Sequence, residues 1–300
     1  MLDIRTDNRR TTIQSKRAIT TATSMASTAL MTLALTLLAS KVQAQDAKRS
    51  ITKVAGDVYR FQNNFHVNVF TITSAGVVVT DPINADAAGW LKAEIAKLTD
   101  QPITHLIYSH SHGDHASGGS AYGDVATVIA QHNAPQAIDG VVPTVRFADA
   151  MQFTHGGKTF ELTHLGPGHG VDLLAVVIRP ENVAFVVDAV SSKRLFFRDF
   201  SNANLDDWAQ QVKTVQSLSF ETFVGGHGAV GVKGDVDDAL AYLSELRTAV
   251  LQGLQAGQCV EQLSKSVTMD KYKGWAAYGQ WRELNVQGMA RHLKASAAAN

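Results

Sequence analysis

Six consecutive residues, 110–115, carry four side chains that can bind metal ions. They read His-Ser-His-Gly-Asp-His, and Gly113 allows the unusual backbone angles of a tight loop. Three imidazoles and one carboxylate are ligands that zinc takes where no thiolate is offered. In such a loop they can diverge to serve two adjacent ions, which favours a metal site over a surface loop that is rich in histidine. The four candidate ligands are His110, His112, Asp114 and His115.

One loop cannot complete two metal sites, because each catalytic ion needs about three protein ligands and an open position. Three further positions offer the missing ligands. His169 lies in a Gly-Pro-Gly-His-Gly turn, Asp188 ends the apolar run 183–187, and His227 follows a predicted strand, 222–224. Each comes directly after a predicted strand, which is where an open-sheet fold presents its chemistry.

The elements that must position these ligands are mainly short strands in the first two thirds of the chain. Residues 45–56 are interpreted as a polar leader, and 235–300 as a helical C-terminal flank of one domain, 45–300. Periodicity and turn residues predict strands at 58–61, 67–73, 76–80, 104–108, 125–130, 152–153, 159–165, 173–178, 183–187 and 222–224. They predict helices at 84–98, capped by Asn84, and at 205–218, 235–255, 259–267 and 272–294. Two packed sheets with helices on the outer faces would bury these runs.

The chain resembles the metallo-β-lactamase-fold superfamily, whose five motifs appear in order between Asp81 and His227. The most specific of them is the HxHxDH pattern of residues 110–115. The resemblance implies an α/β fold of four layers, an αβ/βα sandwich with the metals at one edge. It covers no part of the chain after Gly234.

The resemblance also implies which ligand serves which ion. It places His110, His112 and His169 on the first metal and Asp114, His115 and His227 on the second, with Asp188 bridging both. Asp81 matches an aspartate that supports the metal loop without binding metal. The β-lactamase subclass with a cysteine ligand is excluded, because Asp188 occupies that position and the single cysteine, Cys259, lies elsewhere.

This ligand set implies a hydrolase with two Zn²⁺ per chain. Two cations lower the pKa of a bridging water and supply a metal-bridging hydroxide, and Asp114 orients it and moves a proton. The expected reaction is cleavage of an ester, lactone or related acyl bond. The alternatives are a β-lactamase of the histidine/aspartate-ligand type, a mononuclear iron dioxygenase acting on a sulfur compound, and a metal-binding protein without catalysis.

The substrate-binding residues predicted from the sequence are Phe65, His66, Phe196 and Phe197. Segment 191–200 is either a connector packed on the core or a lid, in which Lys193 or Arg194 would meet an anionic group. Tyr108 is a weaker candidate for the pocket wall.

The remaining histidines and Cys259 are assigned less specific roles. His105 and His132 are expected to be structural, His155 solvated in a hairpin turn, and His292 on the surface. His164 is a candidate either for a contact that supports the His169 loop or for a contact with substrate. Cys259 is interpreted as a small buried hydrophobe.

The first 44 residues show the pattern of an export signal. Basic residues precede the apolar core Ala29–Ala39, and small residues follow it, which favours cleavage after Ala44. The alternative, a membrane anchor, is disfavoured because this core has about half of the ~20 residues that a spanning helix needs. We therefore expect a periplasmic or secreted protein without stable membrane insertion. Its formal net charge of zero argues against nucleic-acid binding and leaves a small-molecule substrate.

Overall fold

The computed structural model describes residues 47–299 of the chain. The predicted signal peptide, residues 1–44, lies outside them. Within 47–299, no helix combines the length and apolar composition needed to cross a membrane.

The first sheet has seven strands in the order in which they occur in the sequence. Strands β1 to β4 pair antiparallel, and β4 to β7 pair parallel. The change of direction requires a crossover, which helix α2 (Ala85–Leu98) supplies, and the Asn84 side chain caps that helix by accepting the Ala87 N–H. The strands are β1 (Arg49–Ala55), β2 (Val58–Asn63), β3 (His66–Thr73), β4 (Gly76–Thr80), β5 (Ile103–Ile107), β6 (Thr127–Gln131) and β7 (Val145–Phe147).

The second sheet has six strands in the order β13-β12-β11-β10-β9-β8. Only β11 and β12 pair parallel, and helix α4 (Leu205–Ser217) lies between them in the sequence. The strands are β8 (Ala150–His155), β9 (Lys158–His164), β10 (Leu174–Arg179), β11 (Val183–Val186), β12 (Thr222–Gly225) and β13 (Gly231–Val232).

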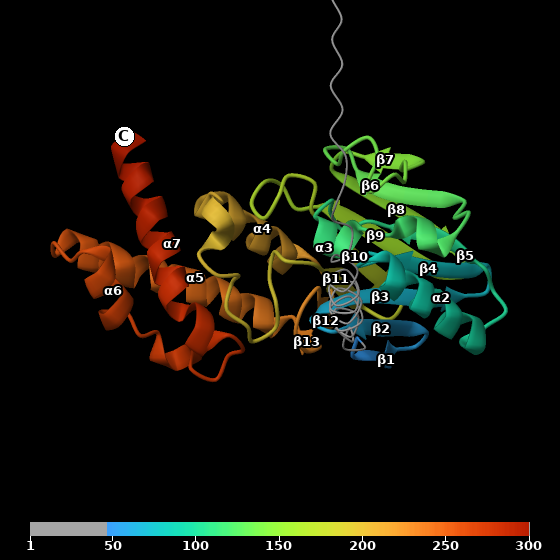
Figure 1. The fold of residues 1–300 in the computed structure, drawn as a ribbon, viewed down its shortest axis with the longest axis horizontal. Coiled ribbons are helices and arrows are strands. Elements are labelled where there is room, and N and C mark those ends of the chain that lie inside the picture. The colour runs from blue at the N-terminus through green and yellow to red at the C-terminus, as the bar shows by residue number, and fades with distance from the viewer. Residues whose placement is uncertain (1–46, 300) are drawn as a thin grey trace, which may run out of the picture. The chain divides into compact units, whose positions relative to one another are not determined.

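The two sheets pack face to face with helices outside them (Figure 1). Val69 and Ile107 of the first sheet share one buried cluster with Val176 and Phe185 of the second. A separate buried cluster joins Leu91 of α2 to the other face of the first sheet. Helices α4 and α5 (Gly234–Gln255) contribute to the cluster of the second sheet. The predicted four-layer sandwich with a helical C-terminal flank is confirmed.

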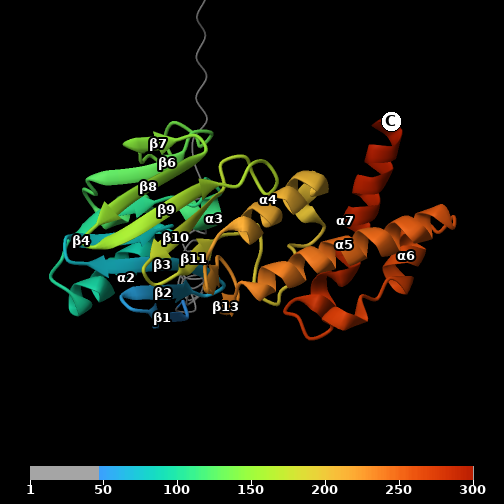
Figure 2. The same cartoon turned by 180° about the vertical axis from the view of Figure 1, so that it is seen from behind.

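The C-terminal helices lie together at one end of the molecule, beyond the sheets (Figure 2). They are α5, α6 (Val260–Ser266) and α7 (Tyr278–Ala299). Buried Asn285 of α7 accepts the Tyr242 O–H of α5 at 2.7 Å and donates to the carbonyl oxygens of Phe196 and Arg198, at 2.9 and 2.5 Å. The flank therefore holds segment 191–200 in place.

Several sequence-based interpretations are wrong. The polar leader contains β1, an edge strand, where charged residues are common. Cys259 is exposed, because α6 begins at Val260 and leaves Cys259 at the helix N-cap. His292 is not a surface residue: its side chain is 10% exposed, and Nε2 lies 3.3 Å from an Asp206 oxygen.

Two of the other histidines form a small cluster against Phe153. The ring of His105 stacks on Phe153 at 5.1 Å and lies 4.3 Å from the ring of His155. His155 Nε2 is 3.0 Å from Thr104 Oγ1, so the expectation that His155 is merely solvated is wrong. His105 is half-buried and packed against Phe153, in keeping with the expected structural role, whereas His132 is exposed.

Acid should destabilise the fold partly through His105. Burial, and then the neighbouring His155, lower the pKa of His105 to about 4. The unfolded chain takes up a proton below about pH 6.5 and the folded chain only near pH 4, so stability falls as the pH drops between these values. Because the ring is half-buried and solvent screens it, we expect a contribution on the order of 1 kcal/mol. Urea unfolding of the wild type and His105→Gln at pH 7 and pH 4.5 measures it; equal losses in both proteins would contradict this assignment.

Candidate metal centre

The HxHxDH loop begins where β5 ends and continues into the short helix α3 (Gly113–Ala116). His110 and His115 are fully buried below the loop, whereas His112 and Asp114 line a cavity. The loop thus directs neighbouring side chains to different sides, as its glycine suggested.

The structure brings all seven predicted ligands together and adds His66. The ligand atoms within each of two groups lie within 4.8 Å of one another. The first group is His110, His112, His169 and Asp188; the second is His66, Asp114, His115 and His227. His66, which is predicted to contact substrate, also places its Nε2 atom 3.4 Å from Asp114 Oδ2.

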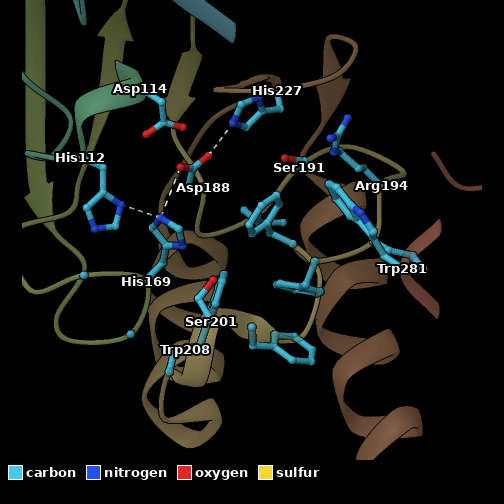
Figure 3. A pocket seen from close by; sticks show the side chains of 18 of the residues that line it. His112, Asp114, His169, Asp188, Ser191, Arg194, Ser201, Trp208, His227 and Trp281 are labelled. Atoms are coloured by element: carbon cyan, nitrogen blue, oxygen red, sulfur yellow. Dashed lines mark hydrogen bonds and ion pairs between the residues drawn. The ribbon is translucent and has the colours of Figure 1, made fainter. Parts of the chain in front are cut away.

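Asp188 lies between the two groups (Figure 3). Its Oδ2 atom is 3.3 Å from His169 Nε2 and 3.5 Å from His115 Nε2, and its Oδ1 atom is 3.1 Å from His227 Nε2. The residue follows β11 with φ of +54°, a left-handed conformation that aspartate tolerates better than most residues. The carboxylate is thus placed to contribute to both groups.

The donor atoms fit metal ions. The His227 Nδ1–H donates to the carbonyl oxygen of Phe65 at 2.7 Å, which leaves Nε2 unprotonated for a metal. His227 Nε2 lies 3.3 Å from His115 Nε2, and His112 Nδ1 lies 3.1 Å from His169 Nε2. Such pairs of ring nitrogens converge on common points, as ligands of one ion do.

A chain of hydrogen bonds connects Asp81 to His110. Ser109 donates to the Asp81 carboxylate through its backbone N–H at 2.7 Å and through Oγ–H at 2.6 Å. The Ser109 oxygen then accepts the Nδ1–H of His110 at 3.0 Å. The Nε2 atom of His110 is buried and has no hydrogen-bond partner among the described residues, so it is left for a metal. Asp81 lies where the predicted supporting role requires it.

The carboxylates of the centre differ in their electrostatics. Burial raises the pKa of Asp81 to about 7, although its hydrogen bonds with Ser109 oppose the shift. Burial would also raise the pKa of Asp188, but the neighbouring imidazoles of His169 and His227 hold it well below its usual value. A hydrogen bond from His66 is the main cause of the lowered pKa of Asp114. Asp114 and Asp188 are therefore ionised at neutral pH, as metal ligands must be.

Helix α4 positions the His169 turn through residues that the sequence did not single out. Buried Gln211 accepts the His169 backbone N–H at 2.8 Å and donates to the Gly166 carbonyl at 2.7 Å. The ring of Trp208 meets His169 edge-on at 5.0 Å, and its Nε1–H donates to the Ala189 carbonyl. The sequence predicts this helix from its amphipathic pattern, but it does not predict that the helix contacts the His169 turn.

Gly226 allows β12 to approach the centre closely. A Cβ atom at this position would lie 2.5 Å from Val187 Cγ1 and 3.0 Å from His115 Cε1. The Gly226 carbonyl also accepts the Val67 N–H at 2.8 Å, which joins the segment after β12 of the second sheet to β3 of the first.

A cavity of about 740 Å³ opens onto both ligand groups. All four predicted substrate-binding residues line it. Phe196 is buried, whereas Phe197 is 48% exposed, so segment 191–200 both packs on the core and forms a wall. Further aromatic walls come from Phe200, Trp208 and Trp281.

Three other candidates do not face this cavity. Lys193 forms ion pairs with Asp235 and Asp238, so of the two basic candidates only Arg194 lines the cavity. Tyr108 is buried, and a Cβ atom on Gly119 would meet its hydroxyl. The His164 Nε2 atom lies 2.8 Å from the Val171 carbonyl oxygen.

A model of the metallo-beta-lactamase superfamily matches residues 64–227, more than half of the chain. The chain belongs to the metallo-beta-lactamase superfamily. Membership and the two groups of possible metal ligands are typical of a metal-dependent hydrolase. The matched region contains all seven predicted ligands and also His66, and it ends at His227.

Several known proteins are similar to this member of the superfamily. The alpha subunit of 2,4-dinitroanisole O-demethylase from Nocardioides sp. is 24% identical over 51% of this chain and 49% of its own length. A metallo-beta-lactamase from Pontibacter korlensis superposes with a TM-score of 0.59 at 21% identity, over 66% of this chain and 99% of that chain. The stereoselective inverting sec-alkylsulfatase from Pseudomonas sp. has a TM-score of 0.63 at 13% identity, over 82% of this chain and 50% of that one. This chain thus spans about half of the O-demethylase subunit and of the sulfatase.

Proposed function

We propose that this chain is an exported hydrolase that uses two zinc ions to cleave an ester, lactone or related acyl bond in a small molecule. One observation carries the proposal: two groups of metal ligands meet at Asp188 on the wall of a cavity large enough for a small substrate. When bound, the zinc ions lower the pKa of a water molecule toward neutrality and polarise the oxygen of the scissile bond.

Asp114 is the residue that we assign to proton transfer. Its side chain is 53% exposed and lines the cavity, and the Nε2 atom of His66 lies 3.4 Å from its carboxylate. Because its lowered pKa keeps it ionised at neutral pH, it can accept a proton from the attacking water and pass it to the leaving group. No serine or cysteine nucleophile is required.

The aromatic walls favour substrates with an apolar acyl or aryl group. Phe196, Phe200 and Trp208 form a buried apolar surface beside the ligand groups. Burying apolar area there contributes about 25 cal/mol per Å² to binding. The bond to be cleaved would then lie at the polar end of the cavity, beside Asp114 and the residues that would hold the zinc ions.

A substrate panel tests the proposed activity. The zinc-loaded protein is assayed with 4-nitrophenyl butyrate, an acyl homoserine lactone and nitrocefin. It is also assayed with 2,4-dinitroanisole and 4-nitrophenyl sulfate, because two of the similar proteins are a 2,4-dinitroanisole O-demethylase subunit and a sec-alkylsulfatase. We expect turnover of the ester or the lactone. If the protein turned over only nitrocefin, only dinitroanisole or only the sulfate, the proposed acyl substrate would be wrong, and the substrate class would be that of the compound turned over.

His112→Ala should reduce this activity by at least about a hundredfold, because the first ligand group loses an imidazole. His132→Ala is the matched control, since His132 is exposed and belongs to neither group. Full activity of His112→Ala would contradict the proposed mechanism.

Export is tested separately from activity. We expect the protein from the periplasm or the culture medium to begin at Gln45, which N-terminal sequencing would show. An uncleaved protein held in the membrane fraction would instead support the anchor.

A further inference from the structure

Arg194 lies at the junction of the metal-centre cavity with a second hollow. The second hollow has a volume of about 620 Å³ and shares Phe65 and Arg194 with the first cavity. We call it the arginine pocket; Arg60, Arg194, Lys53 and Gln62 are its longer polar lining residues, and none of its lining residues is acidic. Figure 3 shows Arg194 beside Trp281, across the cavity from His169 and Asp188.

The guanidinium of Arg194 is held in place by an aromatic ring and not by a carboxylate. Its central carbon lies 4.7 Å from the centre of the Trp281 ring. Within residues 47–299, no acidic oxygen lies within 4.0 Å of it and no side-chain hydrogen bond is formed by it. Lys193, the preceding residue, is by contrast paired with two aspartates. Stacking thus orients the planar group and leaves its N–H donors available.

Arg60 adds a second positive charge that has no acidic partner among residues 47–299. Its side chain on β2 is 8% exposed and donates through Nη2 to the Gly228 carbonyl at 2.8 Å. Its Nε atom is buried without a hydrogen-bond partner in the described part of the chain. Charges in partly dehydrated surroundings are normally paired, because desolvation is otherwise costly. Two such guanidinium groups along one pocket create a positive potential that an anion would balance.

We propose that the arginine pocket binds an oxyanion of the substrate, a carboxylate, sulfonate or sulfate, at a distance from the bond that is cleaved. Arg194 makes the direct contact, because its fork of N–H donors matches two oxyanion oxygens. The apolar part of the substrate lies along the aromatic walls, and the reacting bond lies at the ligand groups. The substrate is therefore an amphiphilic anion. The position of the reacting bond in this inference rests on the proposed function, whereas the binding of the anion does not.

A pair of fluorescent probes tests the binding. 8-Anilinonaphthalene-1-sulfonate carries a sulfonate, and N-phenyl-1-naphthylamine is its uncharged counterpart. We expect Arg194→Met to weaken binding of the sulfonate by about tenfold to a hundredfold, the usual effect of losing a charged hydrogen bond, and to leave the neutral probe nearly unchanged. Arg198→Met is the matched control, since Arg198 is exposed in the same segment and lines neither hollow. Equal affinities of the wild type and Arg194→Met for the sulfonate would overturn the proposal.

Two further measurements keep the test decisive. If Arg194→Met does not fold, Arg194→Lys should bind the sulfonate with intermediate affinity, and rising salt should weaken wild-type binding of the sulfonate only. Wild-type affinities that are equal for both probes and independent of salt would overturn the proposal.

Paired esters separate this inference from the proposed function. Mono(4-nitrophenyl) glutarate and 4-nitrophenyl butyrate differ in a terminal carboxylate. We expect Arg194→Met to raise KM about tenfold or more for the glutarate ester only. If the wild type cleaves neither ester but discriminates between the two probes, the proposed acyl hydrolysis fails and the arginine pocket stands. If it cleaves both and Arg194→Met changes neither KM, the pocket fails and the hydrolase stands.

Discussion

Asp188→Asn should lower hydrolysis by at least about a thousandfold, equivalent to about 4 kcal/mol of transition-state stabilisation. The reason is that Asp188 is the carboxylate whose two oxygens face His169 and His115 on one side and His227 on the other. An amide keeps the size of the side chain but lacks the charge that holds two cations close together. The bound zinc should fall from two ions per chain to one or fewer in buffers of low free zinc.

The asparagine variant should still fold. Asp188 has a φ of +54°, and asparagine tolerates this left-handed conformation as well as aspartate does. Circular dichroism and thermal unfolding of the metal-free proteins check the fold, and Asp100→Asn is a control because Asp100 is exposed outside the centre. A variant that retained two zinc ions and a tenth of the wild-type activity would contradict the role assigned to Asp188.

Trp208→Ala should cost about 3–5 kcal/mol of folding free energy. Trp208 is 2% exposed, and its ring packs edge-on against Phe196 and Phe200. Alanine would leave a cavity under the aromatic wall and would leave the Ala189 carbonyl without the indole N–H. The thermal midpoint of the metal-free protein should fall by roughly 10 °C. His169 would also lose its ring contact, so we expect weaker zinc binding by the first ligand group.

Trp281→Ala is the matched control for this variant. Trp281 lines the same cavity but is only half-buried, so less apolar area is lost. We expect it to cost less than half as much as Trp208→Ala in urea unfolding. Equal costs, or a Trp208→Ala protein as stable as the wild type, would show that Trp208 does not support the centre as described.

The ligands that could be predicted are those that short, local sequence patterns reveal. Four ligands stand within residues 110–115, and Asp188 and His227 each end a run with the apolar pattern of a buried strand. Position at strand ends follows from such patterns, so these residues could be expected at one edge. The superfamily resemblance supplied the order of the layers and the pairing of ligands with metals.

The rest depends on contacts between distant segments. Gln211 reaches the His169 turn from a helix 42 residues away, and Asn285 holds segment 191–200 from the C-terminal flank. His66 joins the second ligand group only because β3 lies beside the metal loop in three dimensions. Whether the N–H donors of Arg194 are paired depends on which carboxylates lie near it in three dimensions. No local sequence pattern predicts that. The error at Cys259 has a related cause, since apolar periodicity located α6 but not the residue at which it begins.

Zinc titration of the metal-free protein, with ester or lactone hydrolysis followed at each step, tests the central claim most directly. Two groups of ligands, with Asp188 of the first group close to His115 and His227 of the second, predict two zinc ions per chain and activity that reaches its maximum only when both are bound. Full activity with one metal ion per chain, or dependence on a single iron and on oxygen, would contradict the claim.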